Sequence, residues 1–357
     1  MPGGIGNHAY CLAKELGRLG FGVTVLTEKR EQRDGDWRRF VEANNELSIF
    51  GVPRNRVPAI TYCHRVLKAN MLVRKADWDA VVFSGKFPLW LNAILPRTRS
   101  IAVIHGSEIK QSGLFRHLFR HGLKKAETVV CVSEFTRGQL SKHYAGVGDQ
   151  NVRTINNGIG NDWLASAPID SRPEHDVVLV TVGAVNRRKG QLNVIRAMPR
   201  ILREFPDATY HIVGLPVEKA CLIGAVDAHG LRSRIAFHDG PCDSEVRSLV
   251  AASHIFMMLS EHLENGDFEG FGIAVVEAMA LGKPAIGSRD SGIADAIEDG
   301  HSGRLVDPRN ADEVAAAVRE IMDDYARYSA NARAAAERAR WKHRVNEYRL
   351  LIDQLCG

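Results

Sequence analysis

One stretch of the sequence, residues 254–287, most narrowly limits what this chain can fold into. An apolar strand expected at Ile255–Leu259 leads into a loop that carries Glu264, Asp267 and Glu269. A helix then starts after glycines and ends before Pro284. The free N–H groups and the dipole at such a helix start favour phosphate. Carboxylates beside them suit hydroxyl groups. The stretch therefore predicts a site for a sugar nucleotide, a ligand with both phosphates and many hydroxyls.

Strands and helices alternate along the whole chain, which predicts parallel sheets covered by helices on both faces. In the first half, strands are expected at 22–26, 47–52, 80–84, 101–104, 128–132 and 152–155, with helices at 7–19, 66–75, 89–95, 114–125 and 134–144. In the second half, strands are expected at 177–182, 209–213, 235–237, 255–259 and 284–286, with helices at 191–204, 311–325, 330–340 and 341–355.

The length of 357 residues is too great for one average core, so we expect two doubly wound domains. The predicted N-terminal domain is residues 1–160 and the predicted C-terminal domain is residues 177–340. Residues 161–176, with two prolines and few apolar side chains, are expected to be the linker. The final helix, near 341–357, is expected to pack back on the N-terminal domain.

The glycines at the start of the chain predict a second close-approach loop. Gly3 and Gly4 precede an amphipathic helix, an arrangement that can bring backbone N–H groups to a phosphate or an acceptor. A doubly wound domain normally places its central first strand ahead of such a loop, and this strand is missing here. Two explanations stay open, a natural start upstream or a fold without this strand, and we favour the first.

Three cations follow the strand that ends at Gly183. Arg187, Arg188 and Lys189 stand at a helix start, where cations oppose the helix dipole unless an anion is bound. The segment therefore predicts a clamp for a diphosphate, and Lys189 is the residue best supported for this role.

The segment EGFGIAVVEAMALGKP, which starts at Glu269, resembles the family 4 retaining nucleotide-sugar glycosyltransferases, and the resemblance extends over most of the chain. It implies the GT-B fold, two Rossmann-like domains facing a central cleft. It also implies that Glu269 contacts the hydroxyls of the donor sugar and that Glu277 holds the ribose. The backbone of Gly270, Phe271 and Gly272 would lie along the sugar and the diphosphate.

The same resemblance bears on the clamp and on the first half. Lys189 matches the family pattern, whereas Ala184 stands where the family usually has arginine, so Arg188, or less well Arg187, is expected to substitute. Family members place a histidine where His105 follows a buried strand, which implies a positioning role near the reacting centre. A lone histidine at a strand end is otherwise more often a packed residue.

The net charge of +5 conceals an asymmetry, because residues 1–160 contain 24 Lys and Arg against 13 Asp and Glu. The expected helix at 114–125 mixes apolar and basic residues, so it could lie on an anionic membrane or simply present a solvated basic face. The charge excess and the family's lipid-linked acceptors favour the membrane. The opening residues lack a signal peptide pattern and no 18-residue apolar run occurs. We therefore expect a cytoplasmic protein, peripheral on the cytoplasmic face of the inner membrane.

Together these features predict a retaining hexosyltransferase that uses a nucleoside-diphosphate sugar and a lipid-linked or oligosaccharide acceptor, in glycolipid, lipopolysaccharide or exopolysaccharide assembly. The histidines and cysteines lack metal-ligand spacing, and we expect no metal, no other cofactor and no nucleic acid partner. The alternative is a catalytically weakened GT-B-fold binding or regulatory protein. A dinucleotide-dependent oxidoreductase is disfavoured, because the first glycines lack the G-x-G-x-x-G spacing.

Overall fold

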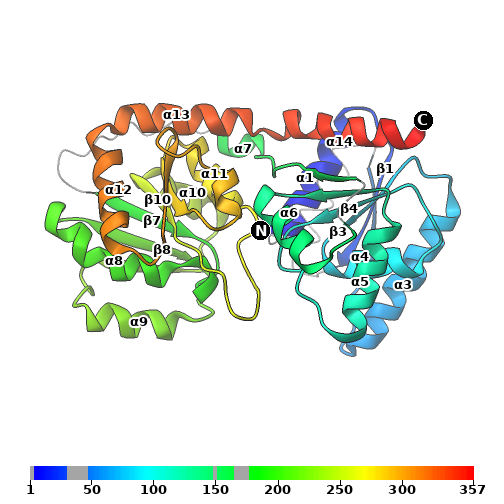
Figure 1. Cartoon of the computed structure of the whole chain (residues 1–357), viewed down its shortest axis with the longest axis horizontal. Coiled ribbons are helices and arrows are strands. Elements are labelled where there is room, and N and C mark those ends of the chain that lie inside the picture. Colours follow the sequence, from blue (N-terminus) through cyan, green and yellow to red (C-terminus); the bar gives the residue numbers. More distant parts are fainter. Residues whose placement is uncertain (1–3, 30–46, 148–150, 165–176) are drawn as a thin grey trace. The chain divides into compact units, whose positions relative to one another are not determined.

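The structure is a computed structural model that describes residues 4–29, 47–147, 151–164 and 177–357 (Figure 1). Its contacts divide the chain into two compact units. The N-terminal unit contains the residues up to Cys131, Leu140–Ile155 and Trp341–Gly357, and the C-terminal unit contains Val132–Gln139 and Asn156–Arg340. Contacts therefore assign the segments 132–139 and 156–160, which the sequence places in the first domain, to the C-terminal unit. Most of the predicted linker lies outside the described residues.

A six-stranded parallel sheet forms the middle of the C-terminal unit. Its strand order is β12-β11-β10-β7-β8-β9, so the chain winds outward from β7 in one direction and from β10 in the other. The strands are β7 (Val178–Val182), β8 (Thr209–Gly214), β9 (Ile235–Asp239), β10 (Ile255–Met258), β11 (Ala285–Ser288) and β12 (Gly303–Val306). β7 and β10 are neighbours, with Leu179 opposite Ile255. A ligand site is expected where such a winding reverses, beyond the carboxyl ends of β7 and β10.

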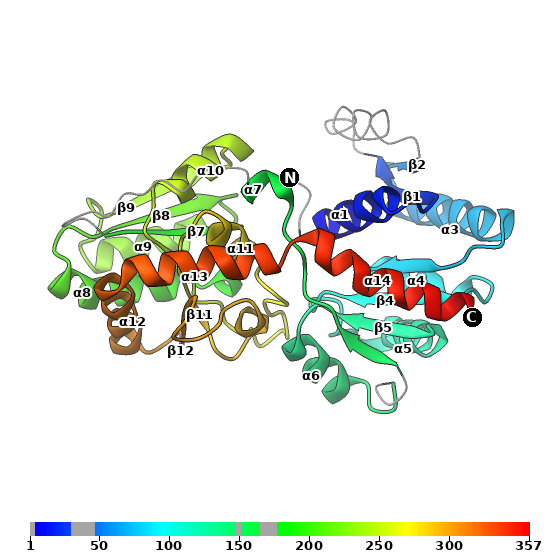
Figure 2. The same ribbon diagram turned by 90° about the horizontal axis from the view of Figure 1, so that it is seen from above.

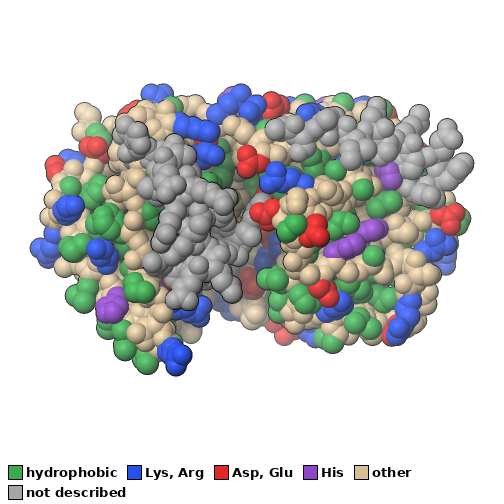
Figure 3. Space-filling view, turned by 180° about the vertical axis from the view of Figure 1, so that it is seen from behind, with side chains coloured by type: hydrophobic (Ala, Val, Ile, Leu, Met, Phe, Trp, Pro, Cys, Tyr) green, Lys and Arg blue, Asp and Glu red, His purple; other side chains and the backbone are tan. Residues whose placement is uncertain are grey.

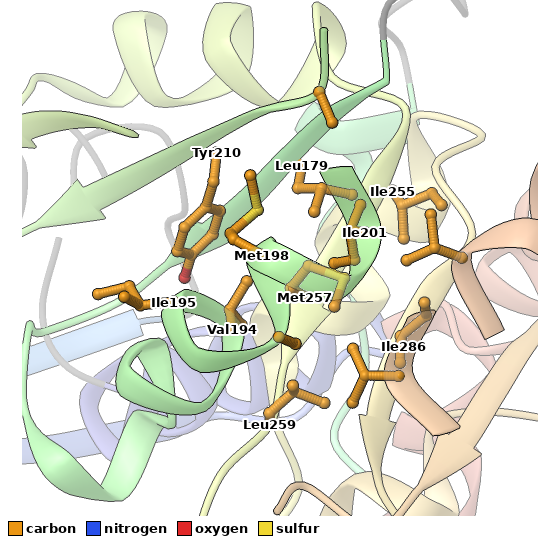
Figure 4. Packing of buried hydrophobic residues seen from close by; sticks show 14 of the residues in the cluster. Leu179, Val194, Ile195, Met198, Ile201, Tyr210, Ile255, Met257, Leu259 and Ile286 are labelled. Carbon is orange, nitrogen blue, oxygen red and sulfur yellow. The ribbon is translucent and has the colours of Figure 1, made fainter. Parts of the chain in front are cut away.

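Helices cover both faces of this sheet (Figure 1). They are α8 (Gln191–Glu204), α9 (Lys219–Ala228), α10 (Asp243–Ala251), α11 (Ile273–Ala280), α12 (Ala311–Asp323) and α13 (Tyr325–Arg338). Figure 4 shows how α8 packs: Val194, Met198 and Ile201 lie against side chains from the sheet. Each of these three side chains is at most 1% exposed. Burial of one such side chain contributes roughly 1.5–3 kcal/mol, so this face fixes α8 on the sheet.

The N-terminal unit has two described sheets, both parallel. One has the strand order β3-β4-β5-β6, and the other is the pair β1-β2. The strands are β1 (Val23–Lys29), β2 (Leu47–Pro53), β3 (Val81–Ser84), β4 (Ser100–Ile104), β5 (Thr128–Cys131) and β6 (Val152–Thr154). β4 and β5 are buried throughout, as inner strands of a parallel sheet are, whereas residues 23–28 of β1 are only half-buried.

Helix α1 (Gly4–Arg18) begins three residues earlier than the sequence predicts. Gly4 is thus the first residue of the helix and not part of a loop, and Gly3 lies outside the described residues. Glycine has a low helix propensity, so the sequence prediction starts the helix after Gly6. A Cβ atom on Gly85 would lie 3.2 Å from the Ile5 side chain, which shows how closely α1 approaches the end of β3.

Helix α14 (Trp341–Cys356) packs beside α1, as Figure 2 shows. The Tyr348 hydroxyl and His8 Nε2 lie 3.1 Å apart, and both side chains are buried. The last helix therefore completes the core of the N-terminal unit.

Several helices differ from expectation. α3 (Pro58–Lys75) starts eight residues before the predicted helix, at a proline that suits the first helical turn. The other helices of the N-terminal unit are α4 (Lys86–Ile94) and α5 (Gly113–Lys125), and α6 (Glu134–His143) spans the two units. The sequence prediction did not include α9, α10 or β12. Short or weakly patterned elements of this kind are stabilised mainly by packing and pairing with the rest of the sheet.

Candidate active site

The acidic segment, residues 261–269, follows the carboxyl end of β10 and is closed by its own hydrogen bonds. The Leu263 N–H donates to the Asp267 carbonyl over 2.9 Å, and the Gly266 N–H donates to the Leu263 carbonyl over 2.7 Å. Phe268 is 4% exposed and its ring lies 5.3 Å from those of Phe135 and His262. The segment is therefore a compact turn anchored by an aromatic contact.

Glu269 ends this segment and binds both clamp cations. Lys189 Nζ lies 2.8 Å from Glu269 Oε2, and Arg188 Nη1 donates to the same oxygen. The other oxygen, Oε1, accepts the Gly272 N–H at the start of α11 over 3.2 Å. Burial would raise the pKa of Glu269, but Lys189 and then Arg188 outweigh it and lower the pKa to about 2. The carboxylate thus occupies an anion position between two cations and a helix N-terminus.

The clamp loop has a backbone that only glycine allows at two points. Gly190 has φ of +74°, and a Cβ atom there would lie 1.7 Å from the Leu259 carbonyl oxygen. Gly183 has φ of +147°, and the Lys189 side chain passes 3.2 Å from where its Cβ atom would be. The Asn186 side chain caps the short helix η2 (Arg187–Lys189) by accepting the Lys189 N–H over 3.1 Å. The ends of β7 and β10 thereby fix Lys189 beside Glu269.

Glu277 lies on α11, and its surroundings differ from those of Glu269. Burial raises the pKa of Glu277 to about 7, with Lys189 lowering it and Asp243 raising it further. The residue as a whole is half-buried. A carboxyl that lacks a strong partner here can accept hydroxyl groups from a ligand.

Gly270 and Phe271 lie between Glu269 and Glu277 in the sequence, and hydrogen bonds and burial fix their positions. The Gly270 carbonyl accepts the hydroxyls of Ser133, over 2.6 Å, and Thr136, over 3.2 Å. Phe271 is 4% exposed, so its side chain belongs to the core and only its backbone can serve a ligand. The structure thus brings together Gly183, Arg188, Lys189, Glu269, Gly270, Phe271 and Gly272, with Glu277 on the following helix.

His105 belongs to the N-terminal unit, at the end of β4. Its ring Nε2 lies 2.9 Å from the Ser84 hydroxyl. The backbone N–H of His105 donates to the buried Glu108 carboxyl. Burial lowers the pKa of His105 to about 4, so the ring is neutral at pH 7. The His8 ring meets it edge-on, with 4.8 Å between the ring centroids.

Two contacts of the predicted site residues were not predicted from the sequence. Asp267 pairs with Arg188, with 3.2 Å between the carboxylate and Nε. His8 lies against His105, 3% exposed and without a described partner for its Nδ1 atom. Asp267 belongs to the carboxylates of the predicted site, but no sequence signal marks either contact, because each joins segments far apart in the chain. The cap at Asn186, by contrast, has an N-cap residue type ahead of a helix and could have been found.

The described parts of the chain contain no group of three or more His, Cys, Asp or Glu side chains placed to hold a metal ion. In the same ranges, no helix combines the length and the apolar character that crossing a bilayer requires.

Comparisons with known proteins find glycosyltransferases similar to this chain. Two family models match the chain, glycosyl transferases group 1 over residues 166–340 and glycosyltransferase family 4 over residues 2–163. One similar protein is the GDP-mannose-dependent alpha-(1-6)-phosphatidylinositol monomannoside mannosyltransferase of Mycolicibacterium smegmatis, 28% identical over 79% of this chain and 78% of that protein. A second, the phosphatidyl-myo-inositol mannosyltransferase of the same organism, is 29% identical over 96% of this chain and 87% of its own.

Solved structures share the fold over almost the whole chain. Sucrose-phosphate synthase from Thermosynechococcus elongatus has a TM-score of 0.80 at 20% identity, covering 99% of this chain and 94% of that one. HepE of Anabaena, solved with UDP and glucose, has a TM-score of 0.79 at 18% identity, covering 99% and 97%. The matches favour an enzyme over the binding or regulatory alternative. The chain belongs to the family 4 glycosyltransferases of the GT-B fold and is a hexosyltransferase.

Proposed function

We propose that the C-terminal unit binds a nucleoside-diphosphate hexose at Glu269, Lys189 and Arg188, and that the enzyme transfers the hexose to a hydroxyl of a lipid-linked acceptor with retention of configuration. One observation carries the proposal. An internal carboxylate already occupies an anion position formed by Lys189, Arg188 and the N-terminus of α11. A site that holds one anion so firmly, with a lowered carboxyl pKa, is built to hold another.

Donor binding would exchange the partners of these groups. The diphosphate takes Lys189 and Arg188, and Glu269 turns to the hydroxyls of the sugar. Glu277, which is half-buried, accepts the ribose hydroxyls. Arginine and lysine both suit this role, since guanidinium binds phosphate through two parallel hydrogen bonds and ammonium as a point charge.

In the transfer step, the bond between the anomeric carbon and the diphosphate oxygen breaks, and the acceptor oxygen bonds to the same face of that carbon. The acceptor proton passes to the departing phosphate, so no separate base is needed. Negative charge grows on the diphosphate, where Lys189, Arg188 and the N–H groups of α11 stabilise it. Because these groups supply the positive charge, we expect activity to persist in EDTA. His105, neutral at pH 7, is proposed to position the sugar.

GDP-mannose is the first donor to test. Relatives named for GDP-mannose or for mannosyl transfer match this chain at 28% and 29% identity. The solved structures with UDP are less than 20% identical, so they bear on the fold and not on the donor. The same relatives are named for phosphatidylinositol-based acceptors, which makes such glycolipids the acceptors to try first.

The donor is tested by thermal stabilisation with GDP-mannose, UDP-glucose and ADP-glucose, since a ligand that binds the folded state raises its melting temperature. Donor hydrolysis and transfer are then followed with the donor that stabilises most. Lys189→Ala is expected to lower turnover at least a hundredfold, the order found when a preorganised donor to the transition state is removed. Lys219→Ala is the matched control, because Lys219 also pairs with a carboxylate, that of Asp239, outside the site.

A Lys189→Ala variant with near-wild-type activity would remove the clamp assignment. Nucleotide binding by the wild type without hydrolysis or transfer would instead support a binding or regulatory protein.

We further propose that the N-terminal unit contacts an anionic membrane through the helices α3, α4 and α5. Residues 47–126 contain 14 Lys and Arg but only three acids, Asp77, Asp79 and the buried Glu108. Large apolar side chains are exposed on the same helices: Ile60, Tyr62, Leu67 and Met71 on α3, Ile94 on α4, and Leu114 and Phe115 on α5. Basic residues around exposed apolar ones are typical of surfaces that bind anionic lipid.

Aromatic contacts join the three helices into one surface. The Tyr62 ring lies 5.0 Å from that of Phe87, Phe87 lies 6.4 Å from Trp90, and Trp90 stacks on Phe115 at 4.4 Å. Lys86 lies over the Trp90 ring. In Figure 3, the lower left, where α3 lies, shows Lys, Arg, His and hydrophobic side chains and no visible Asp or Glu.

Liposomes with and without anionic lipid test this contact, which would place the enzyme at the cytoplasmic face of the inner membrane. The wild type is expected to bind only the anionic vesicles, and less well at high salt. The double variant Leu114→Ser, Phe115→Ser should bind several-fold more weakly. Its control is Leu215→Ser, Val217→Ser, because these residues are exposed apolar side chains of the other unit. Equal, negligible binding of the wild type to both vesicles would refute the proposal.

A further inference from the structure

We infer that Asp267 is a positioning residue of this enzyme, which holds the guanidinium of Arg188 in the orientation that binds the diphosphate of the donor. The inference rests on the proposed function, because it concerns the same donor site. It adds a residue that neither the motif nor the spacing of the acidic segment identifies. It also explains how a chain with Ala184 in place of the usual arginine can supply a second cation.

Arg188 makes two different contacts with the acidic segment. Its Nε lies 3.2 Å from Asp267 Oδ2, and its Nη1 donates to Glu269. A guanidinium has five N–H donors in one plane, so a bond at Nε fixes the plane and leaves donors at the far end for another anion. The contact with Glu269 uses that far end in the ligand-free protein, whereas the contact with Asp267 does not.

The backbone of Arg188 is attached to the same segment. The Glu261 N–H donates to the Arg188 carbonyl over 3.1 Å. The acidic segment therefore holds the main chain of Arg188 at its beginning and the side chain near its end. A side chain bound at both levels is restricted to few rotamers.

Asp267 itself has little freedom. Its N–H donates to the Asn265 side chain over 2.8 Å, and its carbonyl accepts the Leu263 N–H. The next residue, Phe268, is buried in the aromatic contact with Phe135 and His262. A carboxylate held in this way can orient the Arg188 guanidinium, whereas a carboxylate on a mobile loop would move together with the guanidinium.

The two carboxylates that Arg188 binds would then behave differently during catalysis. In the proposed reaction Glu269 turns from the cations to the sugar hydroxyls, so its hold on Arg188 is lost when the donor arrives. Asp267 does not take part in that exchange and keeps the guanidinium oriented. Without it, Arg188 would have to be ordered by the diphosphate itself, and the entropy of that ordering would weaken binding and the transition state.

The test uses the whole enzyme and the donor that stabilises it most. Asp267→Asn is expected to lower kcat/KM about tenfold, which is roughly the contribution of one hydrogen bond to a charged group. Part of the loss should be a higher KM for the donor, and Asp267→Glu should recover part of the activity. The stabilisation by GDP or UDP alone should fall as well, which gives a readout that does not depend on the transfer step.

A double-mutant cycle separates positioning from a merely structural role. In a background of Arg188→Ala, Asp267→Asn should have no further effect on kcat/KM, because Asp267 acts only through Arg188. Asp227→Asn is the matched control, since it neutralises the carboxylate of another Asp–Arg pair, that with Arg232, outside the acidic segment. It is expected to change kcat/KM less than twofold.

An Asp267→Asn variant as active as the wild type, or an equal loss in both backgrounds, would overturn the positioning role and leave the proposed function intact. A wild type that neither binds a nucleoside diphosphate nor consumes a nucleotide sugar would overturn the proposed function and the inference with it.

Discussion

Replacing Glu277 by glutamine should stabilise the folded protein at neutral pH while it weakens donor binding. Burial raises the pKa of this carboxyl from 4.5 to about 7, so the folded state disfavours its charge. A rise of this size in the pKa corresponds to about 3 kcal/mol. Because the residue is partly exposed, we expect Glu277→Gln to raise the free energy of unfolding by about 2–3 kcal/mol at pH 8.

The gain in the free energy of unfolding should increase as the pH rises. Between pH 4.5 and about 7 the folded state binds more protons at Glu277 than the unfolded state does, so its contribution to stability falls as pH rises through this window. Below pH 4.5 the carboxyl is protonated in both states, and the variant and the wild type should be nearly equal. At pH 8 the difference should reach its full value.

Urea unfolding of both proteins, followed by circular dichroism between pH 4.5 and pH 8, measures this difference directly. Other titrating groups cancel in the comparison because both proteins share them. Glu337→Gln is the control: this exposed helix glutamate pairs with Arg340 in the next turn, and the loss of that surface pair should cost less than about 0.5 kcal/mol. A gain that does not vary with pH, or a loss of stability at pH 8, would refute the reasoning.

Three further predictions concern other contacts. Glu269→Gln should lower stability at pH 7 by roughly 2–3 kcal/mol, because its carboxyl pKa of about 2 stabilises the folded state above pH 4.5; the difference should shrink as pH falls below that value, the opposite slope to Glu277. Gly190→Ala should cost at least about 3 kcal/mol in a melting experiment, since φ is +74° and a carbonyl lies 1.7 Å from the new Cβ, whereas Gly224→Ala in a helix with open space should stabilise by about 0.5–1 kcal/mol. Tyr348→Phe should cost roughly 1–3 kcal/mol because it leaves a buried ring nitrogen of His8 without its partner, and an unchanged melting temperature would contradict that contact.

The parts of the fold that could be predicted are those with a strong local pattern. The buried strands β4, β5, β7 and β10 are apolar runs bounded by loop residues, and such runs mark the inside of a parallel sheet. The winding outward from β7 and β10 follows from the alternation of strands and helices. The predicted start of α1 was wrong by three residues, because the low helix propensity of glycine argues against a helix that includes Gly4 and Gly6.

The site could be predicted in part for a related reason. Glu269, Lys189 and Glu277 lie in short motifs whose residue types and spacing suit phosphate and hydroxyl groups, and the structure places the first two 2.8 Å apart. Asp267 and His8 could not be found, since each acts through a residue distant in the sequence. Only the folded turn of the acidic segment brings the Asp267 carboxylate to Arg188, and only α14 brings Tyr348 to His8.

The position of α14 has a consequence for how the protein forms during translation. The helix follows the whole C-terminal unit in the sequence, yet its Trp341 and Tyr348 are buried in the N-terminal unit, against α1. A ribosome therefore releases every residue of the C-terminal unit before the N-terminal unit can complete its core. The half of the chain made first is the half that finishes last, and until then the surface of α1 that α14 covers is available to chaperones.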